Sequence, residues 1–173
     1  MILATDVHYS AGHATAAGLL FESWAAPQAL HCCISQIHEI KPYRPGHFYE
    51  RELPCLLELL REHRLHPDII VVDGYVFLDG ISRPGLGKHL FDALGGCVPV
   101  VGVAKTAFRG IGAEFQVLRG GSTKPLFVTC VGEGLESARA GVRAMHGRHR
   151  LPELLKQVDR LCRDNAPPAA GDT

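Results

Sequence analysis

Three acidic residues occupy positions from which carboxylates could carry out metal-assisted chemistry. Asp6 lies in the apolar N-terminal segment "MILATDVHY", Asp73 ends the apolar run in "HPDIIVVDG", and Glu52 lies at the start of the helix-like segment "RELPCLLELL". Two or three converging carboxylates, with water completing the shell, form a site that suits Mg²⁺. A bound magnesium could activate water and offset charge on a phosphate oxygen. The alternative is that strand-end aspartates only make turn hydrogen bonds.

Lys105 and Gly74 lie at the ends of two other apolar runs. Lys105 ends "VPVVGVAK", where its ammonium could reach a phosphate as a compact point charge. Gly74 directly follows Asp73 and has no side chain, which would let a ligand approach the backbone closely. A solvated strand-end lysine and a plain turn glycine are the ordinary alternatives.

The segment "EIKPYRPGHFYERELP" holds one aromatic residue, Tyr43, between Pro42 and Pro45. The two prolines restrict the backbone on both sides of the ring, which lowers the entropy cost of presenting it. A ring held in this way could enter a base stack and fill the gap left by an extruded base. The alternative is a tyrosine packed against the surface of its own domain.

The elements that must position these residues follow from the apolar pattern. Strands are expected over residues 1–9, 13–24 and 28–37, and later over 66–74, 98–105 and 125–132. Helices are expected from the segment around Leu53–Leu60, with Pro54 in the first turn, and over 84–96, 134–147 and 151–165. This order predicts an α/β fold, in which an antiparallel meander is followed by helix-linked parallel strands in one mixed sheet flanked by helices. The site is then expected at the carboxyl edge of the sheet.

Length and composition predict one globular domain over residues 1–165, with a disordered tail over 166–173. The chain has 173 residues, of which 46% are hydrophobic and 21% charged, enough to bury a core. The absence of a signal peptide and of an apolar run of about 20 residues predicts a cytoplasmic protein without a membrane partner. The six cysteines show no C-x-x-C pair, so we expect reduced thiols packed as small hydrophobes and no structural zinc.

The net charge of zero gives no overall signature of nucleic-acid binding, but the charges are unevenly distributed. Residues 1–104 carry 7 Lys/Arg and 11 Asp/Glu, whereas residues 105–164 carry 11 Lys/Arg and 6 Asp/Glu. An acidic half could gather metal and a basic half phosphate. Ordinary solvated surface is the alternative.

Taken together, these segments resemble the endonuclease V family, the deoxyinosine 3′-endonucleases. The match runs in order from residue 1 to about residue 155 through "ATDV", "PYRPG", "RELPCLLELL", "VVDG", "GVAK", "KPLFVTCVG" and "GRHRLPE". "PYRPG" followed by an R-E-x-P helix start is specific in combination with "VDG" and "GVAK", although none of these motifs suffices alone. The resemblance implies an RNase H-like fold, which agrees with the expected strand order.

The resemblance also implies roles for the residues that match the family's motifs. Asp6 and Asp73 would be metal ligands, Glu52 a further catalytic carboxylate beside Mg²⁺, for which Mn²⁺ could substitute, and Lys105 the phosphate contact. Tyr43 would be the wedge. Family members hydrolyse the second phosphodiester 3′ to a hypoxanthine base and leave 3′-hydroxyl and 5′-phosphate ends, a DNA-repair activity, and some prefer inosine in RNA. The residues expected against the nucleic acid are therefore Tyr43, Pro45, Gly46, Gly74, Arg83 and Lys105.

The chain departs from the family's pattern in two places. After "VDG", Arg83 stands where the family has a histidine, and a slightly longer segment adds Asp79; the late "CVGEG" lacks the usual Gly-His pair. We expect Arg83 to contribute phosphate binding and Asp79 to join the metal shell. No role is assigned to the ten histidines, and His8 is expected to approach the site only from the opposite strand face.

Three functions stay open on the sequence alone. The first is a metal-dependent endonuclease for inosine-containing DNA or RNA. The second is a binding protein that recognises deaminated or distorted nucleic acid without cutting it, and the third is an RNase H-like nuclease of other specificity. The sequence does not separate DNA from RNA, because no residue is recognisable as a contact for a 2′-hydroxyl. A monomer is the favoured oligomeric state.

Overall fold

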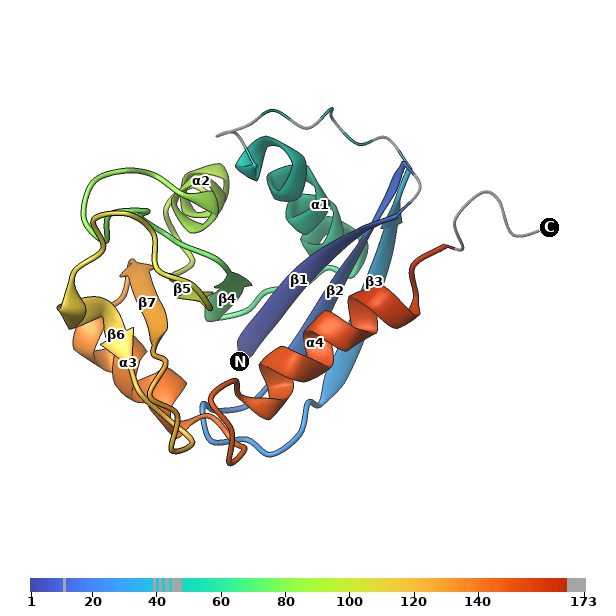
Figure 1. The fold of residues 1–173 in the computed structure, drawn as a ribbon. Coiled ribbons are helices and arrows are strands. Elements are labelled where there is room, and N and C mark those ends of the chain that lie inside the picture. The colour runs from blue at the N-terminus through green and yellow to red at the C-terminus, as the bar shows by residue number, and fades with distance from the viewer. Residues whose placement is uncertain (11, 39, 41, 43, 45–47, 168–173) are drawn as a thin grey trace.

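A computed structural model describes the chain except for residues 11, 39, 41, 43, 45–47 and 168–173 (Figure 1). Its centre is a seven-stranded sheet in the order β3-β2-β1-β4-β5-β7-β6. The strands are β1 (Ile2–Ser10), β2 (His13–Phe21), β3 (His31–Ile37), β4 (Ile69–Asp73), β5 (Val100–Ala104), β6 (Gln116–Val117) and β7 (Leu126–Val131). The α-helices of the described chain are α1 (Tyr49–Glu62), α2 (Leu86–Ala93), α3 (Leu135–Ala144) and α4 (Glu153–Asp164), and a short 3-10 helix spans Ala113–Phe115.

The sheet has the mixed topology expected from the sequence. Strands β1, β2 and β3 form an antiparallel meander, and β4 and β5 then continue parallel to β1. Strand β7 pairs antiparallel to β5, so the parallel part of the sheet ends there. This arrangement confirms the RNase H-like mixed sheet with flanking helices.

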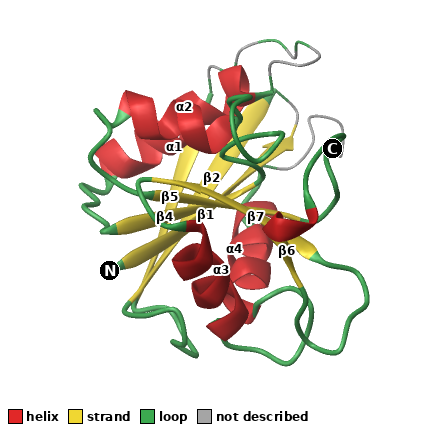
Figure 2. Ribbon diagram, turned by 90° about the vertical axis from the view of Figure 1, so that its left-hand side faces the viewer, coloured by secondary structure: helices red, strands yellow, loops and turns green. Residues whose placement is uncertain are grey.

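Helices cover both faces of the sheet (Figure 2). Helices α1 and α2 lie on one face, where Leu56 and Leu90 pack with Leu3 and Ile70 of the sheet. Helices α3 and α4 lie on the other face and contribute side chains such as Val142 to a second cluster. Successive strand residues point to opposite faces, so the central strands β1, β4 and β5 supply both clusters.

The strand register explains where the acidic residues meet. Strands β1 and β4 are parallel neighbours, and Thr5 pairs with Val72. The next positions are Asp6 and Asp73, at the carboxyl end of β4. The expected convergence of these two residues on one edge of the sheet therefore follows from hydrogen-bond register alone.

Two expectations about local structure are wrong. Pro54 is not in the first turn, because α1 begins at Tyr49 and places Pro54 one turn further along. Glu50 and Glu52 occupy the first turn, where the helix dipole favours acidic residues. The cysteines are free, as expected, but Cys32 and Cys97 are exposed and do not pack as buried hydrophobes.

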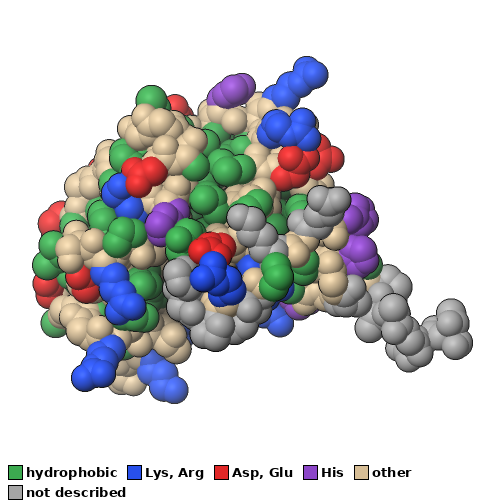
Figure 3. All heavy atoms as spheres, turned by 90° about the horizontal axis from the view of Figure 1, so that it is seen from above, with side chains coloured by type: hydrophobic (Ala, Val, Ile, Leu, Met, Phe, Trp, Pro, Cys, Tyr) green, Lys and Arg blue, Asp and Glu red, His purple; other side chains and the backbone are tan. Residues whose placement is uncertain are grey.

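The surface viewed from above carries acidic, basic and histidine side chains interspersed with apolar ones (Figure 3). Across the described ranges, no helix is both long and apolar enough to cross a membrane. Most of the expected tail, residues 168–173, lies outside the described residues.

Candidate active site

A cavity of about 330 Å³ brings together the acidic residues that the sequence singled out. Asp6, Glu52 and Asp73 line it, together with Lys105. These side chains come from four elements that are far apart in the chain: β1, α1, the end of β4 and the segment after β5. The four predicted catalytic residues therefore share one cavity.

Glu52 is held in the cavity by the first turn of α1. Its side chain is only 5% exposed, because the apolar stripe of α1, which includes Cys55, Leu56 and Leu59, packs against the sheet. Its Oε2 atom is buried and accepts no hydrogen bond from any described group. A buried carboxylate oxygen without a partner is costly, so this atom is suited to a ligand such as a cation.

The electrostatics of the cavity disfavour the ionised carboxylates. Burial, followed by the charge of Asp73, raises the pKa of Asp6 to about 7. Burial raises the pKa of Glu52 well above its ordinary value, and the charges of Asp6 and Asp73 add to that rise. Carboxylates that repel one another in a partly buried site are a recognised feature of metal and catalytic sites.

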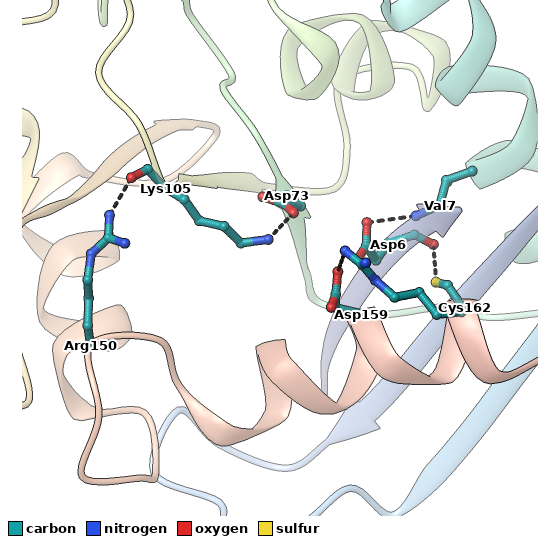
Figure 4. Close-up of polar contacts among 8 residues, drawn as sticks. Asp6, Val7, Asp73, Lys105, Arg150, Asp159 and Cys162 are labelled. Atoms are coloured by element: carbon teal, nitrogen blue, oxygen red, sulfur yellow. Dashed lines mark hydrogen bonds and ion pairs between the residues drawn. The ribbon is translucent and has the colours of Figure 1, made fainter. Parts of the chain in front are cut away.

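Lys105 partly offsets this negative charge. Its Nζ donates a hydrogen bond of 2.6 Å to Asp73 Oδ2 (Figure 4). Burial lowers the pKa of Lys105, but the hydrogen bond and charge of Asp73 outweigh that effect and raise the pKa overall. The backbone of Lys105 is fixed as well, because the Arg150 guanidinium donates to its carbonyl oxygen.

Two residues of this cavity were missed by the sequence analysis. Asp159 and Arg163 of α4 line it, and the guanidinium of Arg163 donates to Asp159 Oδ1 at 3.0 Å. Burial raises the pKa of Asp159, but its bond to Arg163 outweighs this effect and the pKa is lowered overall. The one sequence signal is that Asp159 directly follows Val158, a buried position of the amphipathic helix.

His8 lines the same cavity, so the expectation that it faces away from Asp6 is wrong. The physical reason is the period of a strand. Residues i and i+2 point to the same face, and His8 is two residues after Asp6.

A second cavity, of about 250 Å³, adjoins the first and shares Phe48, Glu52 and Asp73 with it. Gly74 and Arg83, both expected against nucleic acid, line this second cavity. Gly74 has φ of +133° and no atom within 4 Å of the place a Cβ would occupy, so its backbone faces open space.

The wedge residues Tyr43, Pro45 and Gly46 lie outside the described residues. Phe48, which follows them, was also missed, although it is an exposed aromatic residue that lines both cavities. Asp79 lines neither cavity. Its carboxylate instead accepts hydrogen bonds from the backbone N–H groups of Ile81, Ser82 and Arg83, and so shapes the loop that carries Arg83.

The donor set of the first cavity fits Mg²⁺. Asp6, Glu52 and Asp73 supply carboxylate oxygens, the ligands that this ion prefers, and Glu52 Oε2 has no other described partner. Within the described ranges, no group of three or more Asp, Glu, His or Cys side chains is arranged closely enough to form a complete metal-binding site. Asp73 and Asp159 are each turned toward a basic side chain instead.

Comparison with known proteins agrees with this geometry. Residues 1–129 match the family model for endonuclease V. Endonuclease V of Nocardia farcinica is 36% identical over 154 residues, which cover 75% of this chain and 65% of that protein. The chain spans only 60–65% of the length of the first three curated relatives it matches.

Solved structures show the same fold. The crystal structure of endonuclease V from Streptomyces avermitilis superposes with a TM-score of 0.78 at 30% identity, over 94% of this chain and 79% of that chain. A Ciona intestinalis endonuclease V, solved with a 23mer DNA containing an inosine followed by a ribo-adenosine, superposes at 0.76 with 20% identity, over 94% of this chain and 83% of that chain. With the motif order, the carboxylate cavity and the family match in agreement, this chain belongs to the endonuclease V family.

Proposed function

We propose that this protein is a metal-dependent endonuclease that cuts nucleic acid beside inosine. The cut would fall at the second phosphodiester 3′ to the hypoxanthine base and leave 3′-hydroxyl and 5′-phosphate ends. The protein would act in DNA repair, in the cytoplasm. The observation that carries the proposal is the single cavity shared by Asp6, Glu52, Asp73 and Lys105 in a chain of this family. The Ciona protein solved with inosine-containing DNA supports inosine as the base that is recognised.

Asp6, Asp73 and Glu52 would hold Mg²⁺, or Mn²⁺ in its place. When bound, the ion supplies Lewis-acid chemistry, which polarises a phosphate oxygen and makes a water molecule more acidic. Lys105 would place its ammonium against the phosphate and offset charge that develops in the transition state. Before the substrate binds, the hydrogen bond to Asp73 would hold this ammonium beside the carboxylates.

The second cavity would hold the extruded base. Its volume of about 250 Å³ is sufficient for a purine, and it opens beside Asp73 and Glu52. Gly74 exposes backbone there without a side chain, and Phe48 offers a ring for stacking. Arg83, which also lines this cavity, would contact the base or a nearby phosphate.

The test is cleavage of matched labelled DNA and RNA oligonucleotides, each with a single inosine or with adenosine at that position. With Mg²⁺ or Mn²⁺ we expect one nick, one nucleotide beyond the inosine, and no nick in the adenosine strand. The inosine-containing oligonucleotide, DNA or RNA, that is cut faster is the preferred substrate. Binding without cleavage under both ions would replace this proposal with a non-cleaving binding protein.

A further inference from the structure

Arg163 is a second cation that lines the carboxylate cavity together with Lys105. It lies in the last turn of α4 and lines the cavity with Asp6, Asp73 and Asp159. Among the described residues that line this cavity, Lys105 and Arg163 are the two whose side chains are positively charged at all physiological pH values. Neither composition nor motif pointed to this arginine.

Lys105 and Arg163 make equivalent contacts. Lys105 Nζ lies 2.6 Å from Asp73 Oδ2, and Arg163 Nη2 lies 3.0 Å from Asp159 Oδ1. In Figure 4, Lys105 reaches Asp73 from one side, whereas Asp159 lies beside Asp6 on the other. Each cation therefore covers one carboxylate, and together they flank the carboxylate cluster.

The contact of Arg163 is of a kind that is easily exchanged. The Arg163 side chain is 60% exposed, and exposed ion pairs contribute little to stability. A guanidinium can instead bind the oxygens of a phosphate through two parallel hydrogen bonds. A phosphate diester entering the cavity would therefore compete with Asp159 for this guanidinium.

We propose that Arg163 is a substrate-binding residue that leaves Asp159 to bind a backbone phosphate of the nucleic acid. It would hold the strand on the α4 side of the carboxylates, while Lys105 holds it on the β5 side. This inference rests on the proposed function and adds to it a phosphate contact from α4.

The simpler interpretation is that Asp159 and Arg163 form an ordinary pair one turn apart that stabilises the helix. The chain offers a matched control for this alternative. Arg61 of α1 forms a similar pair with Glu58, at 2.5 Å, and its side chain is 74% exposed. Arg61 lines neither of the two cavities.

The experiment compares Arg163→Gln, Arg163→Lys and Arg61→Gln with the wild type in binding to an inosine-containing duplex. Ca²⁺ replaces Mg²⁺, and a gel verifies that the strand stays intact. Loss of one phosphate contact reduces the slope of log affinity against log salt by about 0.9. We expect this reduction for Arg163→Gln, partial recovery for Arg163→Lys and no change for Arg61→Gln. Thermal melting verifies that each variant is folded.

The phosphate itself is located by replacing single phosphates near the cut with neutral methylphosphonates. At the contacted phosphate, the replacement should weaken binding by the wild type. It should not weaken binding by Arg163→Gln any further, because that variant already lacks the guanidinium that contacts this phosphate. Equal slopes for Arg163→Gln and Arg61→Gln, or additive losses at every position, would overturn the inference. Failure of the proposed function looks different: the wild type itself would not cut the inosine strand with Mg²⁺ or Mn²⁺.

Discussion

At the scale of single residues, the Asp6 carboxyl group costs the metal-free protein stability at neutral pH. Its pKa is raised from 3.8 to about 7 by burial and by Asp73. The folded protein therefore binds this proton more tightly than the unfolded chain does, and stability is lost as pH rises from about 4 to about 7. Asn at this position carries no charge and escapes the loss.

We therefore expect Asp6→Asn to melt at the same temperature as the wild type near pH 4 and at a higher one above pH 7. The difference should be about 2 kcal/mol after allowance for solvent screening, or roughly 5 °C. Added Mg²⁺ should reduce this difference by stabilising the wild type. Scanning calorimetry between pH 4 and pH 8 measures the stability difference between Asp6→Asn and the wild type. A difference that shrinks with rising pH would contradict a raised pKa of Asp6.

At the scale of elements, two arginines connect Lys105 to helix α4. Arg150 donates to the carbonyl oxygens of Lys105, Lys124 and Pro125, which joins the end of β5 to the start of β7. Arg119, only 9% exposed, donates in turn to the loop that precedes α4, at the carbonyl oxygens of Met145, Gly147, His149 and Arg150. The loop thus sets the position of Lys105 relative to α4.

Arg150 is expected to act by positioning Lys105 and not by contacting the substrate, so its replacement should reduce turnover. We expect Arg150→Ala to lower kcat roughly 10- to 100-fold, because small displacements of a catalytic group carry costs of that size. Arg150→Lys should recover part of the loss, and Arg148→Ala, a change at an exposed neighbour, should leave kcat unchanged. Steady-state kinetics tests this, and a loss confined to KM would contradict a positioning role.

Gly102 of β5 lets the loop after β4 approach the sheet. A Cβ at this position would lie 2.6 Å from the carbonyl oxygen of Gly74 and 2.7 Å from the backbone nitrogen of Val76. Both are backbone atoms, so the loop that follows Asp73 would have to move. The absence of a side chain at Gly102 therefore helps to define the second cavity, which Gly74 and Tyr75 line.

We expect Gly102→Ala to destabilise the protein by roughly 1–3 kcal/mol, as overpacking does, and to lower activity with it. Gly134→Ala is the control, since a Cβ there meets no atom within 4 Å. Chemical denaturation gives the stability difference. Equal stability of the two variants would show that the loop accommodates the methyl group.

At the scale of the whole molecule, the sequence predicts the parts of the site that lie at element ends. Asp73 ends a strongly apolar strand and Glu52 opens an amphipathic helix, so local pattern places both. Asp159 and Arg163 could not be found in this way, because only the packing of α4 on β1 and β2 brings them to the cavity. Pro54 is a poor marker for the start of α1, because the helix begins at Tyr49 with Glu50 and Glu52 in its first turn and accommodates Pro54 inside it.

A single variant of Asp73 can separate cutting from binding at the carboxylate cavity. Asp73→Asn removes a charge from the carboxylate cavity but leaves the shape of the side chain and the sheet register intact. We expect Asp73→Asn to bind an inosine-containing strand about as well as the wild type, but to lose single-turnover cleavage with Mg²⁺ by several orders of magnitude. Cleavage at a wild-type rate would contradict the assignment of the active site to this cavity.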